Sequence, residues 1–214
     1  MKFLFKKKKK SRSKNTFRKF KIFLSFLFFL GALLSTWPPV QSLIAVTHLS
    51  DPVKLASLEK RGANPRVNKI VYWLHRSNEY QVSPEIILSI ALLINGIHGE
   101  RGLLTQQTML RNIKIAQELG LFSEENKNRL RHGKAGIVIF GPYKGDQVEI
   151  DHIIPVSLAP EIGNELANLE MMPSTLNRKK SNRITSRQIA YAEKFYDIGL
   201  IEENTISQIR NRLK

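Results

Sequence analysis

Two neighbouring residues, Asp151 and His152, place a carboxylate beside an imidazole, and two asparagines follow at Asn168 and Asn177. A neutral imidazole can accept a proton from water at neutral pH, which makes His152 a candidate general base. The carboxylate of Asp151 and the amide oxygen of Asn177 are hard ligands that suit Mg²⁺ or Mn²⁺. Such an ion would bind a phosphate and neutralise charge on the leaving oxygen. These residue types therefore supply candidates for the base and the metal ion that hydrolysis of a phosphodiester bond needs.

Basic residues are concentrated directly after Asn177. Half of the next ten residues are positively charged and none is acidic: Arg178, Lys179, Lys180, Arg183 and Arg187. Clustered lysine and arginine side chains attract the phosphates of nucleic acid. Lys180 lies about one helical turn beyond Asn177, in position to meet a phosphate. We expect Arg178, Lys179, Lys180 and Arg183 to bind the backbone of a nucleic acid.

Three segments carry a resemblance to a known family: E-I-D-H-I-I-P at 149–155, A-N-L-E-M-M-P at 167–173 and S-T-L-N-R-K-K-S-N-R at 174–183. Together they resemble the HNH endonucleases, whose fold is the ββα-metal or His-Me finger. The resemblance covers about residues 135–184. It implies a one-metal mechanism on nucleic acid, with DNA favoured, that leaves 5′-phosphate and 3′-hydroxyl ends. His152 would be the base, Asp151 and Asn177 the metal ligands, and Asn168 the residue that pins the loop and orients the histidine.

The segment departs from the family pattern in two ways. The last metal ligand is Asn177 where the family often has histidine, which favours weakly held Mg²⁺ over tightly held zinc or nickel. The chain contains no cysteine, so it has neither the cysteine pair that supports the loop in many HNH proteins nor a disulfide-linked partner. Asn182 is an alternative ligand, although it lies beyond the expected register. We expect Glu149 to face solvent or to stand behind the metal ligands.

The pattern of apolar residues predicts how these side chains are positioned. We expect strands at 137–140, 148–154 and 167–172, followed by a helix from Pro173 that carries Asn177. Adjacent residues of a strand point to opposite faces, so Asp151 and His152 can serve one site only if the strand bends near its end.

Most of the remaining chain has helical periodicity. We expect helices at 66–77, where His75 lies on the polar face, and at 86–97, where Ser83 and Pro84 are start signals. Further helices are predicted at 105–119, from Ser123 to Gly133, at 186–198 and at 202–213. The last two are expected to pack on the nuclease motif.

The formal net charge of +16 belongs mainly to the N-terminus. Eleven of the 34 lysines and arginines precede residue 43, where there is no acid, and the remainder holds 23 bases against 18 acids. After this basic region, residues 22–34 are uncharged and apolar, which is shorter than the ~20 residues of a spanning helix and typical of a secretion signal. Val40 and Ser42 could mark a cleavage site that releases a chain from Leu43. The alternative is an uncleaved anchor that extends toward Val46. With a cleaved signal or an uncleaved anchor alike, the rest of the chain lies outside the cytoplasm, because the lysines before the apolar run stay on the cytoplasmic side.

The sequence thus predicts an α+β protein: a mostly helical chain with a small ββα-metal finger in its C-terminal half. We divide it into a signal or anchor (1–42), a helical region (43–134), the nuclease motif (135–184) and C-terminal helices (185–214). A metal-dependent endonuclease using Mg²⁺ or Mn²⁺ is the expected function. The alternatives are a catalytically inactive nucleic-acid-binding module and a membrane-tethered interaction protein.

Overall fold

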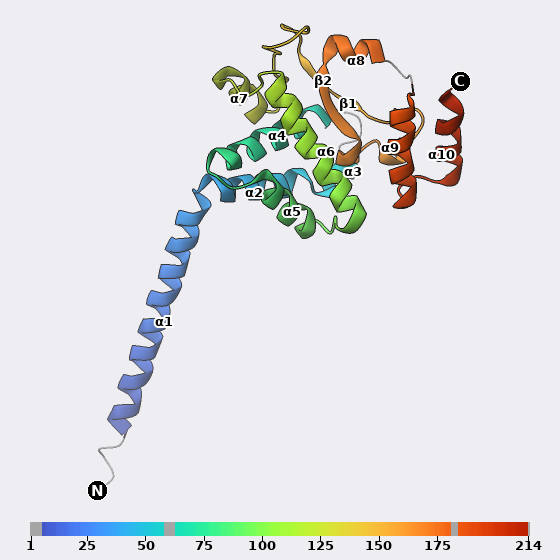
Figure 1. The fold of residues 1–214 in the computed structure, drawn as a ribbon. Coiled ribbons are helices and arrows are strands. Elements are labelled where there is room, and N and C mark those ends of the chain that lie inside the picture. Colours follow the sequence, from blue (N-terminus) through green and yellow to red (C-terminus); the bar gives the residue numbers. More distant parts are fainter. Residues whose placement is uncertain (1–5, 58–62, 181–183, 214) are drawn as a thin grey trace.

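The computed structural model describes residues 6–57, 63–180 and 184–213, which are mostly helical (Figure 1). The N-terminal helices are α1 (Lys6–Ser35), α2 (Pro38–Leu49), α3 (Pro52–Ser57), α4 (Ala63–Glu79), α5 (Pro84–Ile94), α6 (Gly99–Glu118) and α7 (Glu124–Arg131). The C-terminal elements are β1 (Val148–His152), β2 (Leu169–Pro173), α8 (Ser174–Lys180), α9 (Ser186–Asp197) and α10 (Glu203–Arg210). The expectation of a mostly helical chain with a small sheet in its C-terminal half is confirmed.

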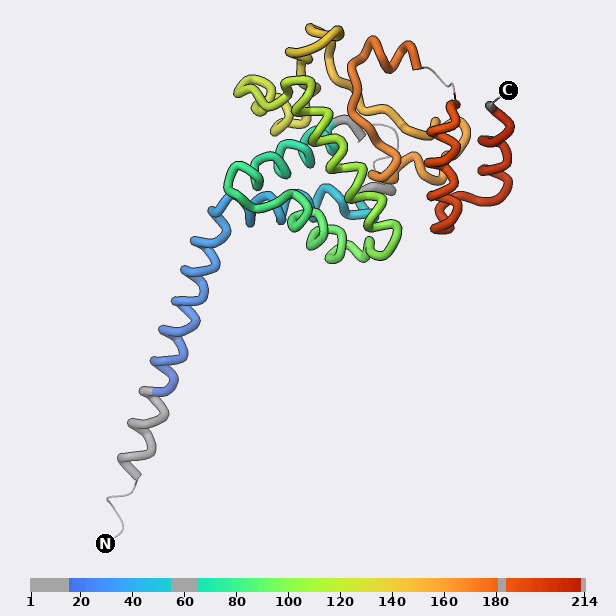
Figure 2. The backbone as a smooth tube through the Cα atoms, viewed as in Figure 1, coloured from blue at the N-terminus to red at the C-terminus, as the bar shows by residue number. Residues whose placement is uncertain are grey.

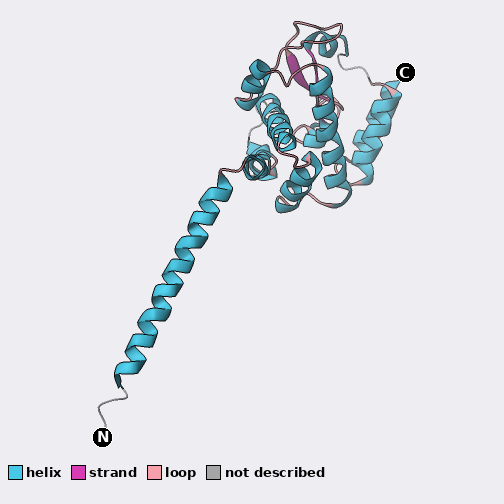
Figure 3. Ribbon diagram, turned by 60° about the vertical axis from the view of Figure 1, so that its left-hand side comes forward, coloured by secondary structure: helices cyan, strands magenta, loops and turns pink. Residues whose placement is uncertain are grey.

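Helix α1 projects away from the rest of the chain in both ribbon views (Figures 1 and 3). In the described part of the chain, no helix taken singly has the length and apolar content to cross a membrane. Taken together, the segments Thr16–Ser35 and Pro38–Leu49 have the required length and apolar content. They are bent by 79° at the break between them. Helix α2 begins at this bend and packs against α4 and α5.

Local signals set several helix ends where the sequence predicted them. The hydroxyl of Ser83 accepts the backbone N–H of Glu85 at the start of α5, and Ser123 accepts that of Asn126 at the start of α7. Gly120 and Gly133 follow α6 and α7 with positive φ angles, which glycine adopts without strain. The predicted helix at 105–119 in fact begins earlier, at Gly99.

Strands β1 and β2 form an antiparallel pair in which Asp151 lies opposite Glu170 and His152 opposite Leu169. Because side chains alternate along a strand, Val148 and Ile150 enter the core while Glu149 and Asp151 lie on the other face. The carbonyl of Leu169 and the N–H of Met171, on the outer edge of β2, are both bonded by the side chain of Asn112 in α6. Helix α6 therefore completes the edge of the sheet.

The predicted strand at 137–140 is wrong. Only Ile137 forms an isolated bridge, to Gln147. The side chain of Asn126 takes both the N–H and the carbonyl of Ile137, at 2.8 Å each, and the N–H of Ile139 donates to Leu119. The backbone N–H of Val138 donates to the Asp146 carbonyl and its carbonyl accepts the N–H of Gly145, so the segment is paired in part with the chain before β1 but forms no continuous ladder.

The strand predicted at 148–154 ends earlier, at His152. Beyond it, the N–H of Ile153 donates to the Asn168 carbonyl and the backbone of Ile154 is bonded by the Asn168 side chain. The third predicted strand begins two residues later and ends one residue later, at 169–173, because 166–168 form a 3-10 turn.

The apolar core continues across residue 135. One cluster joins buried residues of α4 to α7 with Val148, Ile150, Leu169 and Met171 of the sheet. A second cluster centres on Phe195 and joins residues 153–167 with α9 and α10. The tube in Figure 2 shows the red C-terminal helices beside the orange segment that leads into β2. The helical region is thus packed directly on the elements that hold the candidate site.

Candidate functional site

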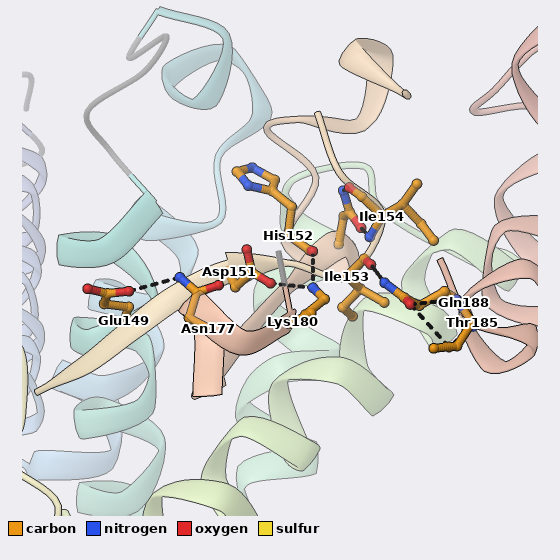
Figure 4. A network of polar contacts seen from close by, with 10 residues as sticks. Glu149, Asp151, His152, Ile153, Ile154, Asn177, Lys180, Thr185 and Gln188 are labelled. Atoms are coloured by element: carbon orange, nitrogen blue, oxygen red, sulfur yellow. Dashed lines mark hydrogen bonds and ion pairs between the residues drawn. The ribbon is translucent and has the colours of Figure 1, made fainter. Parts of the chain in front are cut away.

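The face of the sheet turned away from the core is covered by α8. Glu149 and Asp151 of β1 lie on this face, where they meet Asn177 and Lys180 of α8 (Figure 4). Helix α8 follows β2 without a loop, and the carboxylate of Asp146 accepts the N–H of Thr175 in its first turn at 2.8 Å. That backbone hydrogen bond lowers the pKa of Asp146. The turn before β1 therefore helps to fix the helix that carries Asn177.

Glu149 determines which way the amide of Asn177 points. The Asn177 Nδ2 group donates to Oε2 of Glu149 at 2.8 Å. A carboxylate can only accept here, so the nitrogen of the amide must face Glu149. The amide oxygen is consequently turned to the other side, toward Asp151 (Figure 4). We expected Glu149 to face solvent or to stand behind the metal ligands. Its carboxylate in fact orients the amide of Asn177, a predicted ligand.

Lys180 lies within the site. Its ammonium group donates to the carboxylate of Asp151 and, at 2.7 Å, to the carbonyl of His152. Both side chains of this ion pair are about one-fifth exposed. The carboxylate of Asp151 therefore already faces a positive charge.

Two of the other predicted phosphate-binding residues, Arg178 and Lys179, belong to the described part of the chain. Arg178 and Lys179 are exposed on α8, with the Arg178 guanidinium 3.4 Å from the Ser174 hydroxyl and the Lys179 ammonium 5.8 Å from the centre of the Tyr143 ring. Arg183 and the alternative ligand Asn182 lie outside the described residues.

The imidazole of His152 is held by the loop between the strands. Its Nε2 atom lies 2.9 Å from the carbonyl oxygen of Gly163. A carbonyl can only accept, so Nε2 carries the proton and Nδ1 of the neutral ring keeps a free lone pair. The ring points away from the row formed by Glu149, Asn177, Asp151 and Lys180 (Figure 4). His152 and Asp151 thus leave the end of β1 in different directions, as alternation along a strand requires.

Asn168 fixes the loop that holds His152. It is fully buried, its Oδ1 accepts the N–H of Ile154 at 2.8 Å, and its Nδ2 donates to the carbonyls of Ile154 and Ile162. Ile162 immediately precedes Gly163, whose carbonyl bonds His152. Asn168 is therefore connected to the imidazole through two adjacent carbonyls. It is a positioning residue, in the place that the sequence motif indicates.

Two residues of α9 were not anticipated from the sequence. The side chain of Gln188 donates to the carbonyl of Ile153 at 2.7 Å, and the Tyr191 hydroxyl donates to the carbonyl of Ala167 at 2.7 Å. Each bonds the backbone beside one of the motif residues. No sequence spacing announces these contacts, because they join positions separated by 35 and 24 residues.

A cavity of about 180 Å³ opens beside Lys180, between α6, the end of β1 and α9. It is lined by Arg111, Ile153, Glu170, Lys180, Thr185, Arg187, Gln188 and Tyr191. Arg111 forms an ion pair with Glu170 at 2.7 Å, and its guanidinium lies 5.5 Å from the centre of the Tyr191 ring. Burial raises the pKa of Tyr191. With three cationic side chains against one acid, the cavity favours an anionic group.

The oxygen atoms of Asp151 and Asn177 are of the type that Mg²⁺ or Mn²⁺ prefers, and the Lys180 ammonium already occupies one side of the Asp151 carboxylate. Among the described residues, no three His, Cys, Asp or Glu side chains gather into a metal-binding group. The candidate set thus depends on an amide ligand, which is poorly suited to zinc.

Comparison with protein-family models, with curated proteins and with solved structures finds no match to this chain. The case for function therefore comes from the site itself.

Proposed function

We propose that this protein is a metal-dependent endonuclease of the HNH type that hydrolyses phosphodiester bonds of nucleic acid, with DNA the favoured substrate. One observation carries the proposal: the end of β1 presents on one side an imidazole held through Nε2 by the Gly163 carbonyl and on the other an Asp151 carboxylate toward which the Asn177 amide oxygen is turned. A protein that only bound nucleic acid would gain nothing from fixing one imidazole tautomer at the end of the strand that also carries the carboxylate.

Each residue has a role in this reaction. The free Nδ1 of His152 accepts a proton from the attacking water, while the hydrogen bond to Gly163 stabilises the imidazolium that results. Asp151 and Asn177 would hold Mg²⁺ or Mn²⁺, which when bound supplies positive charge to the phosphate and the leaving 3′ oxygen. Lys180 adds charge beside Asp151 and, together with Arg178 and Lys179, attracts the substrate backbone. The cationic cavity offers a place for a neighbouring phosphate.

We also propose that α1 is a retained membrane anchor with the nuclease outside the cytoplasm. Cleavage after Ser42 would cut α2, in which Pro39, Ser42 and Val46 are buried against the domain. Retention of the N-terminus preserves this packing. The basic residues before α1's apolar run would remain on the cytoplasmic side.

A plasmid-nicking assay tests the activity. Full-length protein in detergent should convert supercoiled plasmid to the open-circular form with Mg²⁺ and not with EDTA. His152→Ala should lower the rate by about 10²- to 10⁴-fold, because it removes the proton acceptor. His132→Ala is the matched control, since the His132 imidazole is exposed at the end of α7, where it bonds the Asn128 carbonyl.

Circular dichroism should show that both variants are folded. A folded His152→Ala protein that nicks as fast as His132→Ala would remove His152 from the mechanism. Tight plasmid binding with no metal-dependent cleavage by the unaltered chain would instead support the inactive binding module.

A further inference from the structure

Helix α5 is apolar on two faces. Ile87, Leu88, Ala91 and Leu92 are buried in the domain. On the opposite face Ile86, Ile90, Leu93 and Ile94 are 54, 40, 66 and 62% exposed. Their spacing of four, seven and eight residues places them in one line along the helix. We call these four residues the α5 stripe.

Helix α2 extends this surface. It packs beside α5, and the two are also joined through Asn95, which donates to the Thr47 carbonyl at 2.8 Å and the Ser50 hydroxyl at 2.9 Å. Ile44 of α2 is 59% exposed, and Trp37, at the bend before α2, is 46% exposed. In Figure 1, α2 and α5 lie on the side of the domain from which α1 departs. The exposed apolar residues are thus gathered near the base of the candidate anchor.

The apolar run of α1 is short for a membrane span. From Ile22 to Ser35 it rises about 21 Å, against a hydrocarbon thickness of about 30 Å. The sequence contains no Asp, Glu, Lys or Arg from Ile22 to Ser50, so the uncharged segment continues through the bend into α2. Since the bend is 79°, α2 lies nearly in the membrane plane when α1 lies along the normal. An aromatic residue such as Trp37 is typical of the level at which such a bend would meet the headgroups.

We propose that the α5 stripe is a lipid-binding surface that enters the headgroup region of the same membrane that α1 crosses. The proposal rests on α1 as a retained anchor and not on nuclease activity. A bilayer fits better than an α1 that folds back, because α1 runs away from the domain in both views (Figures 1 and 3). When the α5 stripe enters the headgroup region, the whole domain lies closer to the bilayer centre and α2 lies at the membrane surface. This position compensates for the short apolar run of α1.

This orientation has a consequence for the candidate site. In Figure 1, β1, β2 and α8 lie on the side of the domain opposite to the exit of α1. Contact of the α5 stripe with lipid would therefore hold the α8 surface toward the aqueous phase. The membrane would then position the site for nucleic acid arriving from solution.

The absence of native cysteine allows a direct test in the full-length chain. Ile90→Cys and Leu93→Cys, each carrying an environment-sensitive fluorophore, are reconstituted in phosphatidylcholine vesicles. Asn204→Cys, at an exposed position of α10, is the matched control. We expect blue-shifted emission from the two α5 labels, quenching by nitroxide lipids and protection from iodide. The α10 label should emit at longer wavelength, should not be quenched by nitroxide lipids and should be quenched by iodide.

Two outcomes would overturn the proposal. If iodide quenches the α5 and α10 labels equally in vesicles, the stripe faces water. If the α5 labels are shielded from iodide but not quenched by nitroxide lipids, and the shielding disappears in nanodiscs holding one copy, a second copy covers the stripe. None of these readouts depends on hydrolysis, so they separate this proposal from the nuclease proposal.

Discussion

The carboxylate of Glu149 accepts from the Asn177 nitrogen, and this bond keeps the amide oxygen turned to the opposite side. Without that carboxylate the amide is free to rotate, and half of its orientations offer a nitrogen that repels a metal ion. Glu149 should therefore act on metal affinity although it need not touch the metal. Residues that orient metal ligands commonly have such an effect.

This dependence gives a prediction for the metal requirement. Asn177→Ala should raise the Mg²⁺ concentration for half-maximal nicking, and Glu149→Ala should raise it about 10- to 100-fold. The measurement is a Mg²⁺ titration of nicking rate. Glu118→Ala, on the exposed end of α6, is the control and should leave the midpoint unchanged. A midpoint that stays fixed in Asn177→Ala would make Asn182 the better candidate, and one that stays fixed in Glu149→Ala would show that the amide needs no such support.

His75 differs from its expected place on a polar helix face. Its ring stacks on Phe122, with centres 3.7 Å apart and planes 5° from parallel. Burial lowers the pKa of His75, and the nearby Glu79 opposes this shift without overcoming it. The positive charges of Lys127 and Arg76 also lower the pKa of His75. The folded protein therefore favours the neutral ring more than the unfolded chain does.

His75 should make the folded protein less stable at acid pH. Because the folded pKa lies below the ordinary value of 6.5, the contribution of His75 to stability is complete above that pH. It declines as the pH falls through 6.5 and through the folded pKa. Urea unfolding at pH 7.5 and pH 5 should show a larger loss of stability in the unaltered chain than in His75→Phe, which keeps the stack but cannot titrate. An equal loss in both would assign the pH dependence to other groups.

At the scale of elements, two buried asparagines take the place of missing backbone partners. Asn112 completes the outer edge of β2, and Asn168 bonds the backbone of Ile154 where β1 has ended. Both side chains are fully buried. Removal of either leaves two buried backbone groups unpaired, at a cost of about 1 to 3 kcal/mol each.

The two asparagines should nevertheless differ in activity. Asn112→Ala and Asn168→Ala should both lower the urea midpoint. Only Asn168→Ala should slow nicking while still folded, because Asn168 also holds the Ile162 carbonyl beside Gly163. Rates measured at a temperature where both variants are folded distinguish the cases. Equal activity of the two variants would argue that Asn168 serves stability alone.

The sequence predicted elements best where local chemistry sets their limits. Ser83, Ser123, Gly120 and Gly133 mark helix ends because their side chains or positive φ angles act within one turn. The strand predicted at 137–140 is limited to one bridge because Asn126 bonds the backbone of Ile137 and the N–H of Ile139 donates to the Leu119 carbonyl. Local propensity contains no information about such competition.

The candidate site shows the same division. The positions of Asp151, His152 and Asn177 follow from one short motif, and their elements are close to those expected. The roles of Gly163 and Gln188, and the pairing of Arg111 with Glu170, could not be predicted, since they arise from packing between segments far apart in the chain. For the same reason, the sequence could not show that the helical region supports the edge of the sheet.

At the scale of the whole molecule, α2 belongs to the folded domain. Pro39 and Ser42 are buried, and the far end of α2 is tied to α5 through Asn95. A secretion signal that ended at Ser42 would remove the first part of this helix. The uncharged segment of residues 22–50 therefore extends, through α2, into the packed domain.

Two truncated chains separate the role of α1 from that of α2. A chain that begins at Thr36 keeps all of α2 and should retain the unfolding temperature and nicking rate of the full-length protein. A chain that begins at Leu43 loses Pro39 and Ser42 and should unfold earlier, since a loss of ~2 kcal/mol lowers Tm by about 4–8 °C for a domain of this size. Mass spectrometry of the protein from cells should correspondingly detect an intact N-terminus. If the Leu43 chain is as stable and active as the Thr36 chain, and the cellular protein begins at Leu43, then α2 is dispensable and the N-terminal segment is a cleaved signal.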